Sequence, residues 1–221
     1  MEISVVVTNY NYGHYISRCI RSLLDQSMNQ HKLKYEIIVV DDKSTDNSLK
    51  ILNAFEDKIK VVKLELNTGL ASAANAGIRQ AQGRLIVRVD ADDYVHPDFL
   101  KLFITANEQL GKEYDVFSMD YLEVDTLGNE ISRKDASLFP IACGLAMKQE
   151  VFYLVGGYTE GLRINEDLDL YKKIISLNKP NKQVHLAGEK QTLGSRGIYN
   201  INMPLYRYVK HGISLTDRIF R

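Results

Sequence analysis

The chain has 221 residues, of which 45% are hydrophobic, so it is long enough to bury a substantial core. Its 28 basic and 28 acidic residues balance, which removes the broad positive field that nucleic-acid binding requires. No apolar run approaches the roughly 18 residues that span a bilayer, and no basic segment precedes an apolar one at the N-terminus. We therefore expect one cytoplasmic domain, residues 1–221, without a nucleic-acid partner.

The first part of the chain alternates short β-branched runs with helical patterns. Strands are predicted at residues 3–7, 35–40, 59–64 and 85–89. The segments between them carry apolar residues at helical spacing, namely Ile16, Cys19, Ile20, Leu23 and Leu24, then Leu49, Leu52 and Phe55, and then the helix at 69–80. This βαβαβαβ series predicts an α/β fold, in which a mostly parallel, twisted sheet has helices on both faces.

Polar residues follow each of these strands, and in an open parallel sheet ligands bind beyond the carboxyl ends of the strands. Thr8 and Tyr10 follow the first strand, Asp41 the second, Asn67 the third and Asp90 the fourth. A tyrosine ring there can stack on a base, and a carboxylate can accept a hydrogen bond from a base or a ribose hydroxyl. The helix at 69–80 is rich in glycine and alanine, which permits either close approach of a ligand or tight packing on the sheet.

The fourth strand ends in three carboxylates within four positions, Asp90, Asp92 and Asp93. A hard divalent cation such as Mg²⁺ or Mn²⁺ prefers such oxygen ligands and can bridge to the phosphates of a substrate. The alternative is that Asp92 and Asp93 begin a turn and cap a helix that Pro97 opens.

Two common nucleotide-binding loops are absent from the sequence. There is no G-x-G-x-x-G after the first strand and no G-x-x-x-x-G-K-[ST] anywhere, which argues against a dinucleotide-binding domain and a P-loop enzyme.

The ordered motifs resemble those of the family 2 inverting glycosyltransferases, which have a Rossmann-like, A-type nucleotide-sugar fold. The resemblance extends over about the first 175 residues and rests on the successive segments at 5–11, 38–46, 67–69, 90–93 and 165–169. Each motif alone is weak, whereas the ordered set is specific.

The resemblance implies where the donor binds. Thr8, Tyr10 and Asp41 would hold the base and ribose of a nucleotide-sugar, usually a UDP-sugar, and Asn67 belongs to the same nucleotide-binding set. Asp90 would contact the ribose or a metal-bound water.

The resemblance also implies a metal and a base. Asp92 would ligate Mn²⁺ or Mg²⁺ directly, and His211 lies in a segment where many members place a histidine near the metal and the pyrophosphate. Asp167 would be the catalytic base for an acceptor hydroxyl, with Glu166 as the next candidate. Acidic residues also favour a helix N-terminus without any function, and a lone histidine can be structural.

The second half of the chain, about 96–221, is less regular and is expected to be a smaller, mixed acceptor-binding portion beside the nucleotide-sugar-binding half at about 1–95. A strand at 115–124 is expected to return through a turn at 127–129. A short strand is predicted at 142–147, followed by helices at 150–154 and from Glu166 onward. The segment 188–200 is either a loop that closes over the nucleotide or a linker.

Some features narrow the expected function. The sequence has no tryptophan, so the Q-x-x-R-W motif of processive synthases is missing, and transfer of a single sugar is favoured. Leu168 and Tyr171 stand where many members carry tryptophan. Residues 207–221 hold four basic residues and one acidic residue, so this tail can make weak peripheral contact with anionic lipid at the inner face of a membrane. Cys19 and Cys143 form no C-x-x-C pair and are expected in the core.

The most consistent function is therefore a metal-dependent inverting glycosyltransferase that moves one sugar to a glycan or glycolipid acceptor. One alternative is a sugar nucleotidyltransferase, against which the missing triphosphate loop argues. The other is a non-catalytic nucleotide-sugar-binding module, which the acidic pair Glu166 and Asp167 disfavours.

Overall fold

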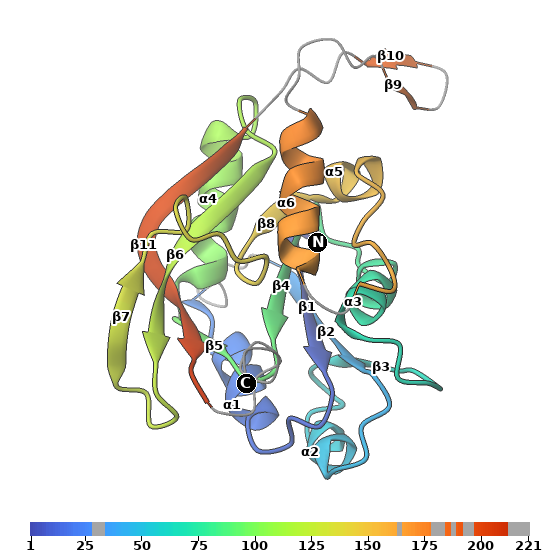
Figure 1. The fold of residues 1–221 in the computed structure, drawn as a ribbon, viewed down its shortest axis with the longest axis vertical. Helices are drawn as coiled ribbons and strands as arrows, with labels where there is room; N and C mark the ends of the chain where they lie inside the picture. The colour runs from blue at the N-terminus through green and yellow to red at the C-terminus, as the bar shows by residue number, and fades with distance from the viewer. Residues whose placement is uncertain (28–33, 163–164, 178–183, 187–188, 192–196, 212–221) are drawn as a thin grey trace.

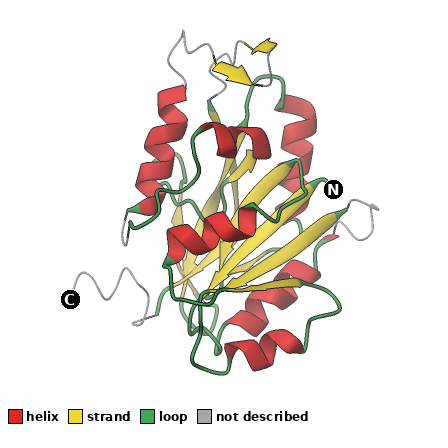
Figure 2. Cartoon of the chain, turned by 90° about the vertical axis from the view of Figure 1, so that its right-hand side faces the viewer, coloured by secondary structure: helices red, strands yellow, loops and turns green. Residues whose placement is uncertain are grey.

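A computed structural model describes residues 1–27, 34–162, 165–177, 184–186, 189–191 and 197–211. Within these residues, nine strands form one sheet and two more form a separate antiparallel pair. The larger sheet has the order β3-β2-β1-β4-β8-β6-β11-β5, with β7 paired to β6 (Figure 1). Helices lie on both sides of it (Figure 2), so the expected α/β architecture is confirmed.

The first half follows the predicted alternation of strands and helices. Its elements are β1 (Ile3–Asn9), α1 (Ile16–Leu24), β2 (Tyr35–Asp41), α2 (Ser48–Asn53), β3 (Lys60–Lys63), α3 (Leu70–Ile78) and β4 (Leu85–Asp90). The four strands are mutually parallel, with β1 between β2 and β4. Helix α2 ends at Asn53, before the last apolar residue that the sequence assigned to it. That residue, Phe55, packs into the core from the turn after the helix.

The second half is mixed, as expected. Its elements are β5 (Tyr94–Val95), α4 (Phe99–Leu110), β6 (Val116–Val124), β7 (Glu130–Lys134), β8 (Ala146–Lys148), α5 (Gln149–Leu154), α6 (Glu166–Leu177), β9 (Val184–Leu186), β10 (Glu189–Gln191) and β11 (Ile198–Val209). Strand β8 runs antiparallel to both β4 and β6, so β4 and β6 run in the same direction. Strand β11 is parallel to β6, and the ends of β1, β4, β6 and β11 therefore point to one edge (Figure 1).

Three local predictions need correction. The strand expected at 142–147 begins only at Ala146, because Gly144 adopts a φ of +76° that a regular strand does not accept. The alternative role of Asp92 and Asp93 as helix caps is wrong, since α4 begins at Phe99 with Asp98 at its cap position. Most of the segment 188–200 lies outside the described residues, and its end, from Ile198, belongs to β11.

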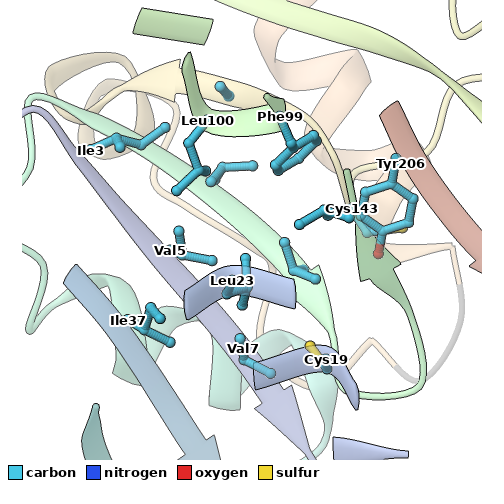
Figure 3. Packing of buried hydrophobic residues seen from close by; sticks show 14 of the residues in the cluster. Ile3, Val5, Val7, Cys19, Leu23, Ile37, Phe99, Leu100, Cys143 and Tyr206 are labelled. Atoms are coloured by element: carbon cyan, nitrogen blue, oxygen red, sulfur yellow. The ribbon is translucent and has the colours of Figure 1, made fainter. Parts of the chain in front are cut away.

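Side chains of the sheet alternate between two apolar layers. Val5 and Val7 point to the layer that contains Cys19 and Leu23 of α1, as Figure 3 shows. Val6 points to the opposite layer, beneath α3, α5 and α6. This alternation follows from the two-residue period of a strand, and because both faces of the sheet are covered, almost every residue of β1 and β4 is buried.

Helix α3 packs very closely on the sheet. A Cβ atom at Gly77 would lie 2.5 Å from Val6 Cγ1 and 2.7 Å from Val40 Cγ2. Of the two explanations for the small residues of this helix, tight packing on the sheet is therefore the one that Gly77 supports.

Both cysteines are buried and unpaired, as predicted. No helix among the described residues is long and apolar enough to cross a membrane. The basic tail falls largely outside the described residues, because the structure describes the chain only as far as His211.

Candidate active site

The site is built around the carboxyl end of β4. Asp90 is the last residue of this strand and lies beside Thr8 of β1 in the sheet register. The Thr8 hydroxyl donates a long hydrogen bond of 3.5 Å to Asp90 Oδ1. Thr8 and Asp90, two of the residues predicted to bind the nucleotide, are thus in contact.

Arg88 links this edge to the second half of the chain. Its Nε lies 3.0 Å from Asp90 Oδ1, and its Nη2 lies 3.1 Å from Asp167 Oδ1. Asp167 belongs to the first turn of α6, and its other oxygen accepts a 3.0 Å hydrogen bond from the backbone N–H of Ala142. The structure therefore brings Asp90 and Asp167 to one buried guanidinium.

The charges of this group are unequally stabilised. Burial alone would lower the pKa of Arg88, but Asp167 and then Asp90 raise it well above its ordinary value, so the guanidinium stays charged. Burial raises the pKa of Asp90, and although Arg88 opposes this shift, Asp92 and Asp167 add to it. The pKa of Asp90 is therefore raised in spite of the ion pair, because burial and two further carboxylates disfavour its ionised form.

Glu166 lies beside Asp167 at the start of α6, where the helix dipole favours negative charge. Burial raises the pKa of Glu166, and the neighbouring Asp167 raises it further. A carboxylate with a raised pKa is a stronger base, so Glu166 remains a chemical alternative to Asp167.

Asp92 and His211 meet across the edge of the sheet. His211 Nε2 lies 2.9 Å from Asp92 Oδ2, and the imidazole is almost fully buried, with 2% of its side chain exposed. The ring stacks on Tyr15 at 4.7 Å between centroids and meets Tyr12 edge-on. The predicted metal-binding pair is therefore assembled, although its two residues are 119 positions apart.

This pair fits a divalent cation. Carboxylate oxygen and imidazole nitrogen are donors that Mn²⁺ accepts, while Mg²⁺ relies more on oxygen. Nδ1 of His211 is buried and has no hydrogen-bond partner among the described residues, so Nε2, which lies beside Asp92 Oδ2, is the ring nitrogen placed to bind the cation.

A second group of possible ligands lies deeper. Among the described residues, Asp90, Asp93 and Cys143 bring ligand atoms within 4.8 Å of one another. However, Asp93 already accepts hydrogen bonds from the Tyr206 hydroxyl, at 2.6 Å, and from the Val209 N–H, at 2.8 Å. Burial also raises the pKa of the Cys143 thiol, which disfavours the thiolate that binds metals. Asp92 and His211 are the better candidates.

Asp93 instead attaches the last strand to the acidic motif. Its two hydrogen bonds hold Tyr206 and Val209 of β11, and His211 follows two residues after Val209. The sequence placed Asp93 in an acidic group that attracts a cation or, alternatively, in a turn that caps a helix. Its structural role depends on a partner more than 110 residues away, which no local pattern reveals.

The remaining predicted nucleotide ligands lie along β1 to β3. Asp41 is buried and accepts hydrogen bonds from Asn9 Nδ2, at 2.8 Å, and from the Ser44 N–H, at 3.0 Å. Asn67 is exposed and donates to the carbonyl of Asp42. Tyr10 is 42% exposed, as a residue that offers a stacking surface to a base would be. Within the described part of the chain, none of these three side chains forms a hydrogen bond with Asp90.

Asp42 is a further carboxylate whose role the sequence did not reveal. It accepts hydrogen bonds from the N–H groups of Thr68 and Gly69 and from the Thr68 hydroxyl, and so fixes the turn before α3. Arg88 was likewise overlooked, although a charged residue inside an otherwise apolar strand is a signal for a buried ion pair.

Comparisons with known proteins identify the family of the chain. The family model described as "Glycosyl transferase family 2" matches residues 4–165. An uncharacterized glycosyltransferase of Nostoc sp. is 33% identical over 172 residues, which are 68% of this chain and 52% of that protein. The poly(ribitol-phosphate) β-N-acetylglucosaminyltransferase TarS of Staphylococcus aureus is 38% identical over 104 residues, which are 46% of this chain and 18% of that protein.

Solved structures show the same fold. TarS residues 1–349 in complex with UDP-GlcNAc align with a TM-score of 0.75 at 23% identity, over 96% of this chain and 59% of that one. The mannosyltransferase PcManGT of Pyrobaculum calidifontis, in complex with GDP-Man and Mn²⁺, aligns with a TM-score of 0.63 at 19% identity, over 95% and 56%. The chain thus spans about half the length of the first relative and less than two thirds of these structures. On the extent of the family match, the chain belongs to glycosyl transferase family 2.

Proposed function

We propose that this chain transfers one sugar from a UDP-sugar to a hydroxyl group of a glycan or glycolipid, with inversion at the anomeric carbon. The observation that carries the proposal is the convergence of Asp90 and Asp92 at the end of β4 with Asp167 and His211 from the second half. The relatives support it, because TarS is named as an N-acetylglucosaminyltransferase acting on poly(ribitol-phosphate) and binds UDP-GlcNAc. A role in polysaccharide synthesis follows by the same comparison.

The donor is proposed to bind along β1, β2 and β4. The exposed ring of Tyr10 would stack on the base, while Thr8, Asp41 and Asn67 would contact the base and ribose. Asp41 has both oxygens engaged by Asn9 and Ser44, and its remaining lone pairs would accept a hydrogen bond from the base. Asp90 would contact the ribose.

Asp92 and His211 would hold Mn²⁺ or Mg²⁺ beside the diphosphate. A bound divalent cation offsets the negative charge that develops on the leaving nucleoside diphosphate. PcManGT, which shares the fold, was solved with GDP-Man and Mn²⁺, and it supports a metal in this chain.

Asp167 is proposed as the base. The acceptor oxygen forms a bond to the anomeric carbon as the bond from that carbon to the diphosphate breaks, and the hydroxyl proton passes to the Asp167 carboxylate. One displacement from the face opposite the leaving group inverts the configuration, and no covalent enzyme intermediate is needed. Asp167 is 28% exposed at its side chain, so an acceptor can reach it.

The decisive experiment compares the wild type with Asp167→Asn. UDP release is measured with UDP-glucose, UDP-galactose and UDP-N-acetylglucosamine, each with Mn²⁺ and a panel of simple glycosides. We expect the variant to bind UDP with unchanged affinity and to lose at least 10²-fold in turnover, because the base acts only in the transition state. Unchanged turnover would move the base elsewhere, and Glu166→Gln is the next variant to examine.

The same assay separates the two other functions. Release of pyrophosphate from UTP and a sugar 1-phosphate would identify a nucleotidyltransferase. UDP binding without turnover of any donor would leave a binding module.

A further inference from the structure

Arg88 is a buried cation at a position where a strand residue would ordinarily be apolar. It lies between Val87 and Val89 in β4, and only 2% of its side chain is exposed. A buried guanidinium is retained only when charges and hydrogen bonds compensate for its lost hydration. Its partners therefore indicate what it does.

The partners of Arg88 are a carboxylate proposed to contact the donor and the carboxylate proposed as the base. Nε and Nη2 contact the two oxygens of Asp90 at 3.0 and 3.3 Å, while Nη2 also lies 3.1 Å from Asp167 Oδ1. Asp90 ends a strand of the nucleotide-binding half, and Asp167 begins a helix of the second half. One planar guanidinium thus spans the two halves.

The guanidinium is held in place by its surroundings. Its Cζ lies 5.3 Å from the centroid of the Tyr158 ring, in a cation–π arrangement. The backbone of Tyr158 is fixed in turn by Asn75 of α3, whose side chain donates to the Tyr158 carbonyl and accepts from its N–H. Arg88 therefore has little freedom to leave either carboxylate.

The segment at 142–144 also hydrogen-bonds to both Arg88 and Asp167. The N–H of Gly144 donates to the carbonyl of Arg88 at 2.9 Å, and the N–H of Ala142 donates to Asp167 Oδ2 at 3.0 Å. Asp167 is consequently held at one oxygen by Arg88 and at the other by a loop that is bonded to the backbone of Arg88.

We propose that Arg88 is a positioning residue, whose guanidinium sets the location of Asp167 relative to Asp90 and so aligns the base with the bound donor. The proposal rests on the proposed function, because it assigns a purpose to a contact between the base and a donor-binding carboxylate. Arginine suits this role because its planar, rigid guanidinium holds Nη2 between the two carboxylates, where it donates to Asp90 Oδ2 and forms an ion pair with Asp167 Oδ1, whereas lysine carries a single point charge on a flexible stem.

The test is Arg88→Lys, which keeps the charge and removes the fork. Turnover of the UDP-sugar is expected to fall at least tenfold, while KM for the donor stays within threefold, because the variant still places a cation beside Asp90. A purely structural role predicts a lower melting temperature with kcat unchanged in the folded fraction. Wild-type kcat in the folded variant would overturn the proposal.

A matched control uses the ion pair at the opposite end of β4. Lys148, which pairs with Leu85 in the sheet register, contacts Asp115 at 2.6 Å. Lys148→Gln is expected to lower the melting temperature and to leave kcat within twofold. If both variants reduced kcat equally, loss of stability would account for the effect, and the proposal would fail.

A stability cycle tests the contact without any turnover. Residues in contact couple, so Arg88→Lys should lower the melting temperature less in the Asp167→Asn background than in the wild type. Equal shifts in both backgrounds would overturn the positioning contact. If Arg88→Lys does not fold, Tyr158→Leu removes the ring above the guanidinium, and Tyr158→Phe is its control. The kcat of Tyr158→Leu should then fall at least threefold below that of Tyr158→Phe.

The outcomes also separate the two proposals. A wild type that releases no UDP from any donor, yet shows coupling in the cycle, would contradict the proposed function while leaving the contact intact. An active wild type with an equally active Arg88→Lys variant would contradict only the positioning role.

Discussion

The two halves of the sheet are assembled differently. In the first half, each strand is separated from the next by one helix, and β1 to β4 are joined by parallel pairs. In the second half, β8 is inserted between β4 and β6, and β11 pairs with β6 across about 80 residues of chain. The first half, residues 1–95, is built from local strand–helix units, and we call it the frame. The contacts that bring Asp167 and His211 of the second half to the end of β4 join residues far apart in the sequence, and we call them the junction.

The carboxylates follow the same division. Asp41 and Asp42 bind neighbouring backbone and side-chain donors within the first half. The motif at 90–93 instead faces the second half, since Asp90 shares Arg88 with Asp167, Asp92 meets His211, and Asp93 holds β11. Acidic residues of similar appearance in the sequence thus serve either the frame or the junction.

The largest effect is expected at the junction, from Asp92→Ala. Its turnover should fall by roughly 10²-fold or more, which corresponds to about 3 kcal/mol of transition-state stabilisation lost with the metal contact. UDP release reports the change, and the Mn²⁺-dependent increase in melting temperature with UDP should disappear. Asp57→Ala, at an exposed acidic residue, is the control. Turnover within threefold of the wild type would remove Asp92 from the site.

A change in the frame should act on stability alone. Gly77→Ala places a methyl group against Val6 and Val40, and we expect a loss of about 1–3 kcal/mol in the free energy of unfolding from overpacking. Urea denaturation measures it, with Ser72→Ala on the same helix as control. The kcat of the folded variant should be unchanged. A large fall in kcat would contradict the expectation that a change in the frame affects stability alone.

Tyr206→Phe tests the attachment of β11. The hydroxyl donates to Asp93 and accepts from the N–H of Asp90, so its removal leaves buried polar groups unpaired and should cost about 1–2 kcal/mol. Chemical denaturation gives this value, and Tyr199→Phe, at a partly exposed residue of the same strand, should change little. Equal stability of the two variants would mean that Asp93 does not depend on this bond.

The smallest effect concerns Asp46, which accepts hydrogen bonds from the N–H groups of Ser48 and Gly13. Partial burial alone would raise its pKa, but the bonds from Ser48 and Gly13 lower it below the ordinary value. The carboxylate therefore stabilises the fold above the unfolded pKa of about 3.9, and this contribution is lost as pH falls through the lower folded pKa.

Asp46→Ala should accordingly reduce the free energy of unfolding at pH 7 by less than about 1 kcal/mol, because solvent screens this exposed carboxylate, and by progressively less below pH 4. Urea denaturation of both proteins over this range measures the difference. A difference that is independent of pH would assign the effect to packing instead of charge.

The elements that were predicted correctly are those whose contacts are local in the sequence. The helix at 16–24 and the turn at 127–129 were predicted correctly, because their apolar spacing and turn residues act locally. The short strand at 146–148 was misplaced, because its extent depends on pairing with β4 and β6. The roles that the resemblance assigns to Thr8, Tyr10, Asp41 and Asn67 stay predictions until a donor complex is measured.

By itself, the sequence determined the alternating α/β frame and the set of acidic residues that end its strands, because apolar periodicity and strand-end chemistry depend on neighbouring residues. The order of its motifs carried the resemblance to the family. Only the tertiary structure decided which partner each of these acidic residues contacts. Arg88 joins Asp90, two positions away, to Asp167, which lies 79 positions further along the chain than Arg88. Asp93 is bonded to β11 across 113 and 116 positions. Burial and pairing of charge depend on which distant segments pack together, and local sequence does not contain that information.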